Sequence, residues 1–214
     1  MMSPGVFVSF EGTEGCGKST QIGMLGQAIA ARGREVVRVR EPGGTPLGEE
    51  VRKLLKHSPA GEGMCAEAEL LLFAASRAQL ARALIRPALA RGAFVLADRF
   101  LDSTTVYQGM ARGLPADAVA TINTLAIGGQ LPHLTILLDI DVAGSRARTA
   151  ARGESSDRFE REDDDFFERV RAGYLALAAA SPDRFVVLDA TASPDHIHQA
   201  ILTRLRPHTH GLFD

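Results

Sequence analysis

The chain has 214 residues, 45% of them hydrophobic and 23% charged, and a formal net charge of −2 at pH 7. This length suits one well-buried core, and the near-neutral charge argues against a nucleic-acid or membrane surface, which would need a strong basic field. No basic start followed by a long apolar run precedes the stretch Val6–Phe10, so we expect a cytoplasmic protein with a small-molecule partner. Two distant cysteines, Cys16 and Cys65, lack metal-ligand spacing and are expected to be unpaired.

Short apolar, β-branched runs alternate along the chain with longer helical patterns. The predicted strands are Val6–Glu11, Glu35–Arg40, Phe94–Asp98, Leu134–Asp139 and Phe185–Asp189. The predicted helices are Lys18–Ala31, Leu47–Leu55, Ala66–Ala90, Ala116–Ile127, Val142–Ala151, Phe166–Ala180 and Pro194–Leu205. This alternation predicts a three-layer α/β fold whose central parallel sheet of five strands is flanked by helices. We expect one domain over residues 1–214, because the glycine-containing breaks are typical of internal loops.

The most specific motif is Gly-Thr-Glu-Gly-Cys-Gly-Lys-Ser at residues 12–19, which satisfies the P-loop pattern Gly-x-x-x-x-Gly-Lys-Ser/Thr. It follows a predicted strand and begins a predicted helix, as a phosphate-binding loop requires. Glycines allow backbone N–H groups to face phosphate oxygens, Lys18 reaches the β- and γ-phosphates, and the Ser19 hydroxyl can ligate Mg²⁺. The alternative is a chance glycine turn ending in Lys-Ser, which would arise in roughly one chain of this length in a hundred.

The predicted strand Phe94–Asp98 ends in an acid, as the second motif of nucleotide-binding sheets does. A carboxylate at this edge can support the metal, so Asp98 is a candidate metal ligand beside Ser19. An aspartate that closes an apolar strand is, however, equally often ordinary loop chemistry. Arg99 follows directly, which places opposite charges next to the expected phosphate site.

Six blocks in chain order resemble the thymidylate kinase family over nearly the whole length. They are Phe10-Glu11-Gly12, Arg40 to Thr45, Leu72 to Arg77, Asp98 to Ser103, Tyr107-Gln108-Gly109 and Asp189-Ala190-Thr191. The resemblance implies a nucleoside monophosphate kinase of the P-loop NTPase fold that moves the γ-phosphate of ATP to dTMP, with Mg²⁺, in dTTP synthesis. We also expect a homodimer. The sequence departs from the family at Phe100, where tyrosine is usual, and at Thr104-Thr105, where small serine-like residues are common.

The resemblance also implies roles for individual residues. The expected ATP contacts are Gly12, Thr13, Glu14, Gly15, Cys16, Gly17, Lys18, Ser19 and Thr20. Glu14 is similar to the acid that accepts a hydrogen bond from the acceptor 3′-hydroxyl, although it could instead complement the helix dipole. Phe73 is similar to the aromatic that stacks on thymine, and Arg77, one helical turn later, to the residue that donates to the base. From its apolar neighbours alone, Phe73 would be assigned to the core.

The other residues expected to contact dTMP include the group that would hold its α-phosphate. They are Glu41, Arg52, Asp98, Arg99, Ser103, Thr104 and Gln108. A guanidinium fork suits phosphate oxygens, which favours Arg99 and Arg52 for this task. Arg52 could equally be a solvated charge on a helix.

Phosphoryl transfer needs positive charge at the moving γ-phosphate, and the four variable P-loop positions carry none. Five arginines surround the segment Gly-Glu-Ser-Ser at 153–156: Arg146, Arg148, Arg152, Arg158 and Arg161. We therefore predict a flexible lid at about 148–162, with Arg148 and Arg152 on one helix face as catalytic residues beside Lys18 and Arg99. The resemblance agrees, since family members without a P-loop arginine carry it in the lid. The alternative is a solvated arginine face that balances the acidic run at 160–165.

Two other functions remain open at this point. One is another nucleoside or nucleotide kinase of the same fold, which the base-recognition residues would distinguish. The other is a nucleotide-dependent switch, for which the P-loop alone would suffice. A GTPase-type switch would be expected to carry Asn-Lys-x-Asp, whereas the chain's only asparagine is Asn123, within a helical pattern and followed by threonine.

Overall fold

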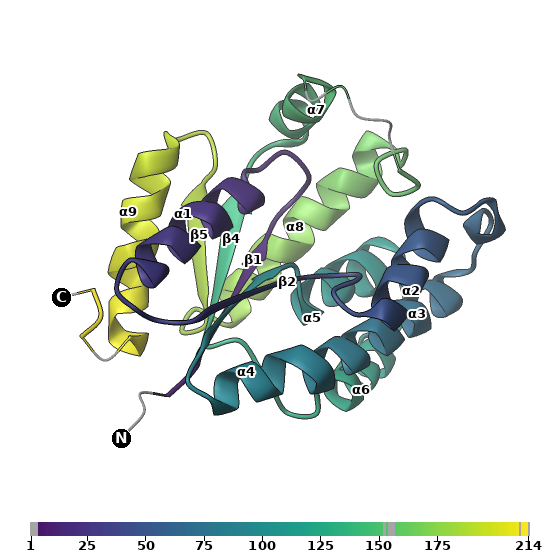
Figure 1. Ribbon diagram of the computed structural model, residues 1–214. Helices are drawn as coiled ribbons and strands as arrows, with labels where there is room; N and C mark the ends of the chain where they lie inside the picture. Colours follow the sequence, from purple (N-terminus) through teal and green to yellow (C-terminus); the bar gives the residue numbers. More distant parts are fainter. Residues whose placement is uncertain (1–3, 152, 154–156, 210, 214) are drawn as a thin grey trace.

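Five parallel strands form one sheet in the order β2-β3-β1-β4-β5 in the computed structural model, which describes residues 4–151, 153, 157–209 and 211–213 (Figure 1). The strands are β1 Val6–Glu11, β2 Val36–Arg40, β3 Phe94–Asp98, β4 Leu134–Asp139 and β5 Phe185–Asp189. Each lies where an apolar run predicted it, and only β2 begins one residue later than expected. The five-stranded parallel sheet is therefore confirmed.

The carboxyl ends of the neighbouring strands β2, β3 and β1 meet at one edge of the sheet. Phe10 of β1 is in register with Asp98 of β3, which is also in register with Arg40 of β2. The loops that follow these strands therefore emerge side by side, and they carry the P-loop, Arg99 and Glu41. This is the edge at which open α/β sheets bind their ligands.

Helices cover both faces of the sheet. Helices α1 Lys18–Ala30 and α9 Pro194–Leu205 lie together on one face (Figure 1) and pack on alternate strand residues such as Phe10. The opposite face carries α8 Asp164–Ala180 and α4 Arg86–Ala90. The remaining helices are α2 Pro46–Lys56, α3 Ala66–Leu80, α5 Leu101–Thr104, α6 Ala116–Ile127 and α7 Val142–Ala151, with short 3₁₀ turns at Pro59–Gly61 and Arg206–His208. None of the helices in the described ranges is long and apolar enough to span a membrane.

Two helical regions differ from the sequence prediction. The predicted helix Ala66–Ala90 contains a π-helical segment, Ala81–Ile85, between α3 and α4. Pro87 lies just after this segment and has no N–H to donate one turn back, which favours a local change of hydrogen-bond spacing. The second region, α5 with the π-helical segment Thr105–Ala111, was not predicted as helical. This second region matters for the site, because it carries Ser103, Thr104 and Gln108, which are expected to contact dTMP.

Candidate active site

The P-loop connects β1 to α1 and needs glycine at three positions. Gly12, Gly15 and Gly17 have φ values of 128°, 74° and 100°, in the left-handed region that side chains disfavour. A Cβ atom on Gly12 would also lie 2.4 Å from the carbonyl oxygen of Leu138. Gly17 precedes α1 without a side-chain cap, so the first N–H groups of the helix remain available to an anion.

Lys18 is only 6% exposed and its ammonium lies against the loop itself. It donates to the carbonyl oxygens of Gly12 at 3.2 Å and Thr13 at 2.9 Å, and to the Cys16 thiol at 3.6 Å. Burial and the positive charge of Arg99 lower the pKa of Lys18, but nearby negative charges, including the carboxylates of Glu14 and Asp98, more than offset this and raise the pKa above its ordinary value. Lys18 is therefore charged at neutral pH.

A pocket at the start of α1 is lined by Glu14, Gly15, Gly17, Lys18, Ser19, Thr20, Asp98 and Arg148. We call it the phosphate pocket. Six of the nine expected ATP contacts line it, and so do the two candidate metal ligands, Ser19 and Asp98. Gly12, Thr13 and Cys16 do not line it; Cys16 is buried and belongs to the core beneath α1.

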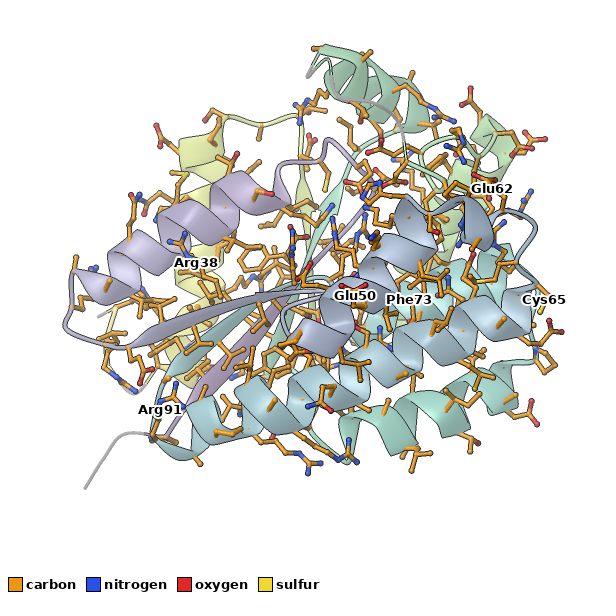
Figure 2. The ribbon with its side chains drawn as sticks, turned by 45° about the vertical axis from the view of Figure 1, so that its right-hand side comes forward. Arg38, Glu50, Glu62, Cys65, Phe73 and Arg91 are labelled. Carbon is orange, nitrogen blue, oxygen red and sulfur yellow. The ribbon has the colours of Figure 1, made fainter. Side chains whose placement is uncertain are left out.

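A second pocket, here the acceptor pocket, is lined by Glu14, Glu41, Pro42, Lys56, Phe73, Arg99, Ser103, Thr104, Tyr107, Gln108, Phe159, Glu160 and Phe167. Glu14 lines both pockets, so they meet at this residue. Phe73, labelled in Figure 2, comes from α3 and is half-buried, with its ring centroid 5.7 Å from that of Phe159. Tyr107 lies 6.5 Å from the same ring, so three aromatic side chains from distant segments form one wall.

Arg99 lines the acceptor pocket and is held in one orientation beside Glu14, where the two pockets meet. It is the one non-glycine residue with a positive φ, 69°, among those that the structure describes. Its guanidinium donates to the hydroxyls of Ser103 at 3.2 Å and Tyr174 at 3.1 Å and to the carboxylate of Glu14 at 3.1 Å. It also lies over the Tyr107 ring, 5.3 Å from the centroid. Backbone strain at a residue fixed by four neighbours is typical of a functional position.

Glu14 and the surrounding cations stabilise one another. Burial raises the pKa of Glu14, but the positive charges of Lys18 and Arg99 hold it well below its usual range. The carboxylate is therefore ionised at neutral pH. It can accept hydrogen bonds at the boundary of the two pockets, and its contact with the 3′-hydroxyl of an acceptor stays a prediction.

Arg77, which was expected to donate a hydrogen bond to the base, does not line the acceptor pocket. The side chain is 1% exposed, and its Nε and Nη2 atoms donate to the carboxylate of Glu41, with Nε to Oε2 at 2.8 Å. The guanidinium also donates to Thr104 at 2.8 Å and to Asn123 at 2.9 Å. Glu41 and Thr104 do line the pocket, so Arg77 touches it through them. A direct contact between Arg77 and a base stays a prediction.

The other residues that were expected to contact dTMP fall into two groups, those that line the acceptor pocket and those that do not. Ser103, Thr104 and Gln108 line the acceptor pocket. Asp98 lines only the phosphate pocket, and Arg52 lines neither, because its guanidinium donates to the carbonyl oxygen of Pro42 at 3.0 Å.

The arginines of the predicted lid have different partners. Arg148 lines the phosphate pocket, whereas Arg146 is 3.0 Å from Asp164 and Arg158 is 2.6 Å from Glu69. Arg161 is ion-paired with Glu62, which Figure 2 labels. Arg152 lies outside the described residues. Three of the five arginines thus balance carboxylates, and Arg148 is the described lid arginine that faces the phosphate pocket.

The chain matches the family model described as thymidylate kinase over residues 10–201. The chain belongs to the thymidylate kinase family. It is 49% identical over 204 residues to a thymidylate kinase of Chromohalobacter salexigens, covering 95% of this chain and 96% of the relative. A thymidylate kinase of Geobacter sulfurreducens is 51% identical over 190 residues, covering 86% and 89%. The crystal structure of thymidylate kinase from Ehrlichia chaffeensis superposes with a TM-score of 0.78 at 30% identity, covering 94% and 99%.

Membership of the thymidylate kinase family confirms the P-loop kinase fold and the enzyme class predicted from the sequence. Sequence reasoning missed several residues of the site. Tyr107 was part of a recognised block but was given no role, while Lys56 and Phe159 carried no signal in the sequence. Lys56 ends α2 and is 2.6 Å from Asp157, which draws the segment containing Phe159 over the acceptor pocket.

Proposed function

We propose that the chain transfers the γ-phosphate of ATP to dTMP, giving ADP and dTDP for dTTP synthesis. The observation that carries this proposal is the meeting of two pockets at Glu14, one at the P-loop and one with an aromatic wall. Two anionic nucleotides can lie end to end across this boundary, as direct transfer requires. A nucleotide switch has no need of the second pocket.

In the proposed acceptor complex, the base stacks on Phe73, and the free N–H groups of Arg99 donate to the phosphate of dTMP. The contacts of Arg99 with Ser103, Tyr174 and Glu14 orient its guanidinium before the substrate arrives. Preorganisation of this kind lowers the barrier, because no rearrangement is needed when charge moves. No general base is required, since the acceptor phosphate oxygen is already an anion near neutral pH.

On the donor side, the α1 N-terminus and Lys18 bind the phosphates of ATP. Ser19 and Asp98 would hold Mg²⁺, which neutralises charge on the β- and γ-phosphates when it is bound. Their oxygen atoms suit this ion, and both residues line the phosphate pocket. Within the described ranges, no group of three or more His, Cys, Asp or Glu side chains could hold a metal. Mg²⁺ takes most of its ligands from phosphates and water, so few protein oxygen ligands are needed.

The proposed catalytic arginine is in the lid at about 148–162. Arg148 is supported by its place on the phosphate pocket and by its hydrogen bond to Gly15. Arg152 shares its helix face in the sequence and stays a prediction. The single-domain organisation of residues 1–214 also stays a prediction.

Self-association and location in the cell complete the proposal. We propose a homodimer formed through α3 and α6, which pack against each other and expose the large apolar side chains Leu71, 57% exposed, and Leu125, 75% exposed. Light scattering after size exclusion measures the mass, and a mass of one chain at micromolar concentration would contradict it. The cytoplasmic location stays a prediction.

The decisive experiment is a panel of nucleoside monophosphates with coupled detection of ADP. We expect rapid ADP release with dTMP and only slow release without an acceptor. A second monophosphate used better than dTMP would favour another kinase of this fold. Turnover that does not depend on any acceptor would contradict a transferase.

A further inference from the structure

We propose that Glu69 selects the base in the acceptor pocket by fixing the side-chain amide of Gln108 with its carbonyl oxygen toward the base. The inference rests on the proposed function, because it takes dTMP as the acceptor. Glu69 acts as a positioning residue, and Gln108 makes the contact.

The two side chains meet in the interior, next to the aromatic wall. The amide nitrogen of Gln108 donates to Oε1 of Glu69 at 2.7 Å, and each residue is 1% exposed. Glu69 lies on α3, one helical turn before Phe73, and Gln108 lies on the π-helical segment that also lines the acceptor pocket. The pair therefore joins the two elements between which a stacked base would lie.

The charge of Glu69 decides which way the amide points. Arg158 is 2.6 Å from one carboxylate oxygen of Glu69 and Arg112 is 3.2 Å from the other, so both oxygen atoms already accept hydrogen bonds from guanidinium groups. An ionised carboxylate only accepts hydrogen bonds, whereas an amide has a donor end and an acceptor end. Turning the Gln108 amide over would place two oxygen atoms at hydrogen-bond distance with no hydrogen between them. Its NH₂ group must therefore face Glu69.

The opposite end of this amide is then fixed as an acceptor. Across the part of the chain that the structure describes, the carbonyl oxygen of Gln108 accepts no hydrogen bond, although the side chain is buried and lines the pocket. This oxygen atom is not among the buried side-chain atoms that lack a partner, so it is accessible from the pocket, where a ligand N–H group can bond to it.

Pyrimidine bases differ at the atom that this carbonyl would meet. Thymine and uracil carry a hydrogen on N3, whereas N3 of cytosine is itself an acceptor. A fixed carbonyl thus pairs with the first two bases and opposes the third, in line with the rule that a mismatched polar group is rejected strongly. The 5-methyl group plays no part in this choice, so dUMP serves as an internal control for dCMP.

The test measures kcat/KM for dTMP and dUMP and the competitive inhibition constant of dCMP, at saturating ATP, for the full-length protein. In Glu69→Gln the new amide can accept as well as donate, so the Gln108 amide can turn over. We express the preference for dTMP over dCMP as the inhibition constant of dCMP divided by the KM for dTMP, and we expect it to fall about tenfold or more. The ratio of kcat/KM for dTMP to that for dUMP should stay the same. Arg158→Met, which removes another partner of Glu69 but leaves the bond to Gln108, should change neither ratio.

Gln108→Leu keeps the inference testable if Glu69→Gln does not fold, because it removes the contact itself. Its preference for dTMP over dCMP should also fall, and the double variant should lose no more than Gln108→Leu alone, since Glu69 acts through Gln108. An unchanged preference in folded Glu69→Gln, or in Gln108→Leu, would overturn the inference. Failure of the wild-type protein to phosphorylate dTMP would overturn the proposed function instead.

Discussion

Tyr174 of α8 donates a hydrogen bond of 2.9 Å to the buried carboxylate of Glu11 at the end of β1. The same carboxylate accepts from the Ser103 hydroxyl at 2.6 Å and from the backbone N–H of Phe100 at 2.7 Å. The oxygen atoms of Tyr174 and Ser103 in turn accept from Arg99. Glu11 therefore sets the direction of both hydroxyls that orient Arg99.

Glu11→Gln is expected to lower kcat/KM for dTMP by about tenfold while the KM for ATP changes much less. The amide has one oxygen atom where the carboxylate has two, so either the two hydroxyls, which share Oε2, lose their acceptor or the backbone N–H of Phe100 does. Steady-state kinetics with each substrate varied in turn measures this. Asp139→Asn is a matched control, because Asp139 also ends a strand but pairs with Arg171 outside both pockets. Equal losses in the two variants would contradict a role for Glu11 in orienting Arg99.

The stability of the fold should depend on pH through the carboxyl group of Glu11. Burial, with a smaller contribution from Asp102, raises the pKa of Glu11 from its ordinary 4.5 to about 7, against the lowering effect of Arg99. The folded chain then holds a proton that the unfolded chain has released, so this contribution to stability is complete below pH 4.5 and is lost as the pH rises through about 7. The free energy of unfolding of the wild type minus that of Glu11→Gln should fall between about pH 4.5 and pH 7. Urea titrations measure the free energy of unfolding of both proteins across this range. Parallel pH profiles for the wild type and Glu11→Gln would contradict the prediction.

Arg148→Ala or Arg152→Ala is expected to lower kcat by about 10³-fold while the KM for dTMP moves much less. The reason is that a lid arginine stabilises charge on the transferring phosphoryl group, which the P-loop cannot do without an arginine of its own. Arg161→Ala is the control, since this lid arginine is half-exposed and paired with Glu62. If neither variant nor the double variant slows turnover even tenfold, the charge comes from another residue.

Arg77→Ala should destabilise the fold by about 3–5 kcal/mol, because it leaves the buried carboxylate of Glu41 without its partner. Burial raises the pKa of Glu41 while Arg77 lowers it, so the unpaired acid would take up a proton more readily. Arg82→Ala is a suitable comparison, because that exposed arginine donates only to backbone carbonyls. Urea unfolding measures both, and a similar small effect in the two variants would show that the Arg77–Glu41 pair contributes little.

Kinetics on Arg77→Ala separate stability from substrate binding. The variant should lose kcat/KM for dTMP with little change in the KM for ATP, since Arg77 bonds to Thr104 and Glu41 of the acceptor pocket but to no residue of the phosphate pocket. An unchanged kcat/KM for dTMP in folded protein would contradict it.

The sequence by itself determined the strands, the P-loop and the family. A buried parallel strand needs a continuous apolar run, and the P-loop is eight consecutive residues whose glycines serve local backbone geometry, so both are encoded over short distances. The π-helical segment within the predicted helix 66–90 was not predicted, although Pro87, its local cause, is present in the sequence.

Only the tertiary structure decided which charged residue lines a pocket and which faces another side chain. Arg77 and Arg148 are both arginines on predicted helices, yet Arg77 is buried against Glu41, 36 positions away, and Arg148 lines the phosphate pocket. Glu69 and Gln108 are likewise 39 positions apart. Such pairs form because burial leaves a polar group no solvent to bond with, and the partner that satisfies it is set by how helices pack, which no local pattern contains.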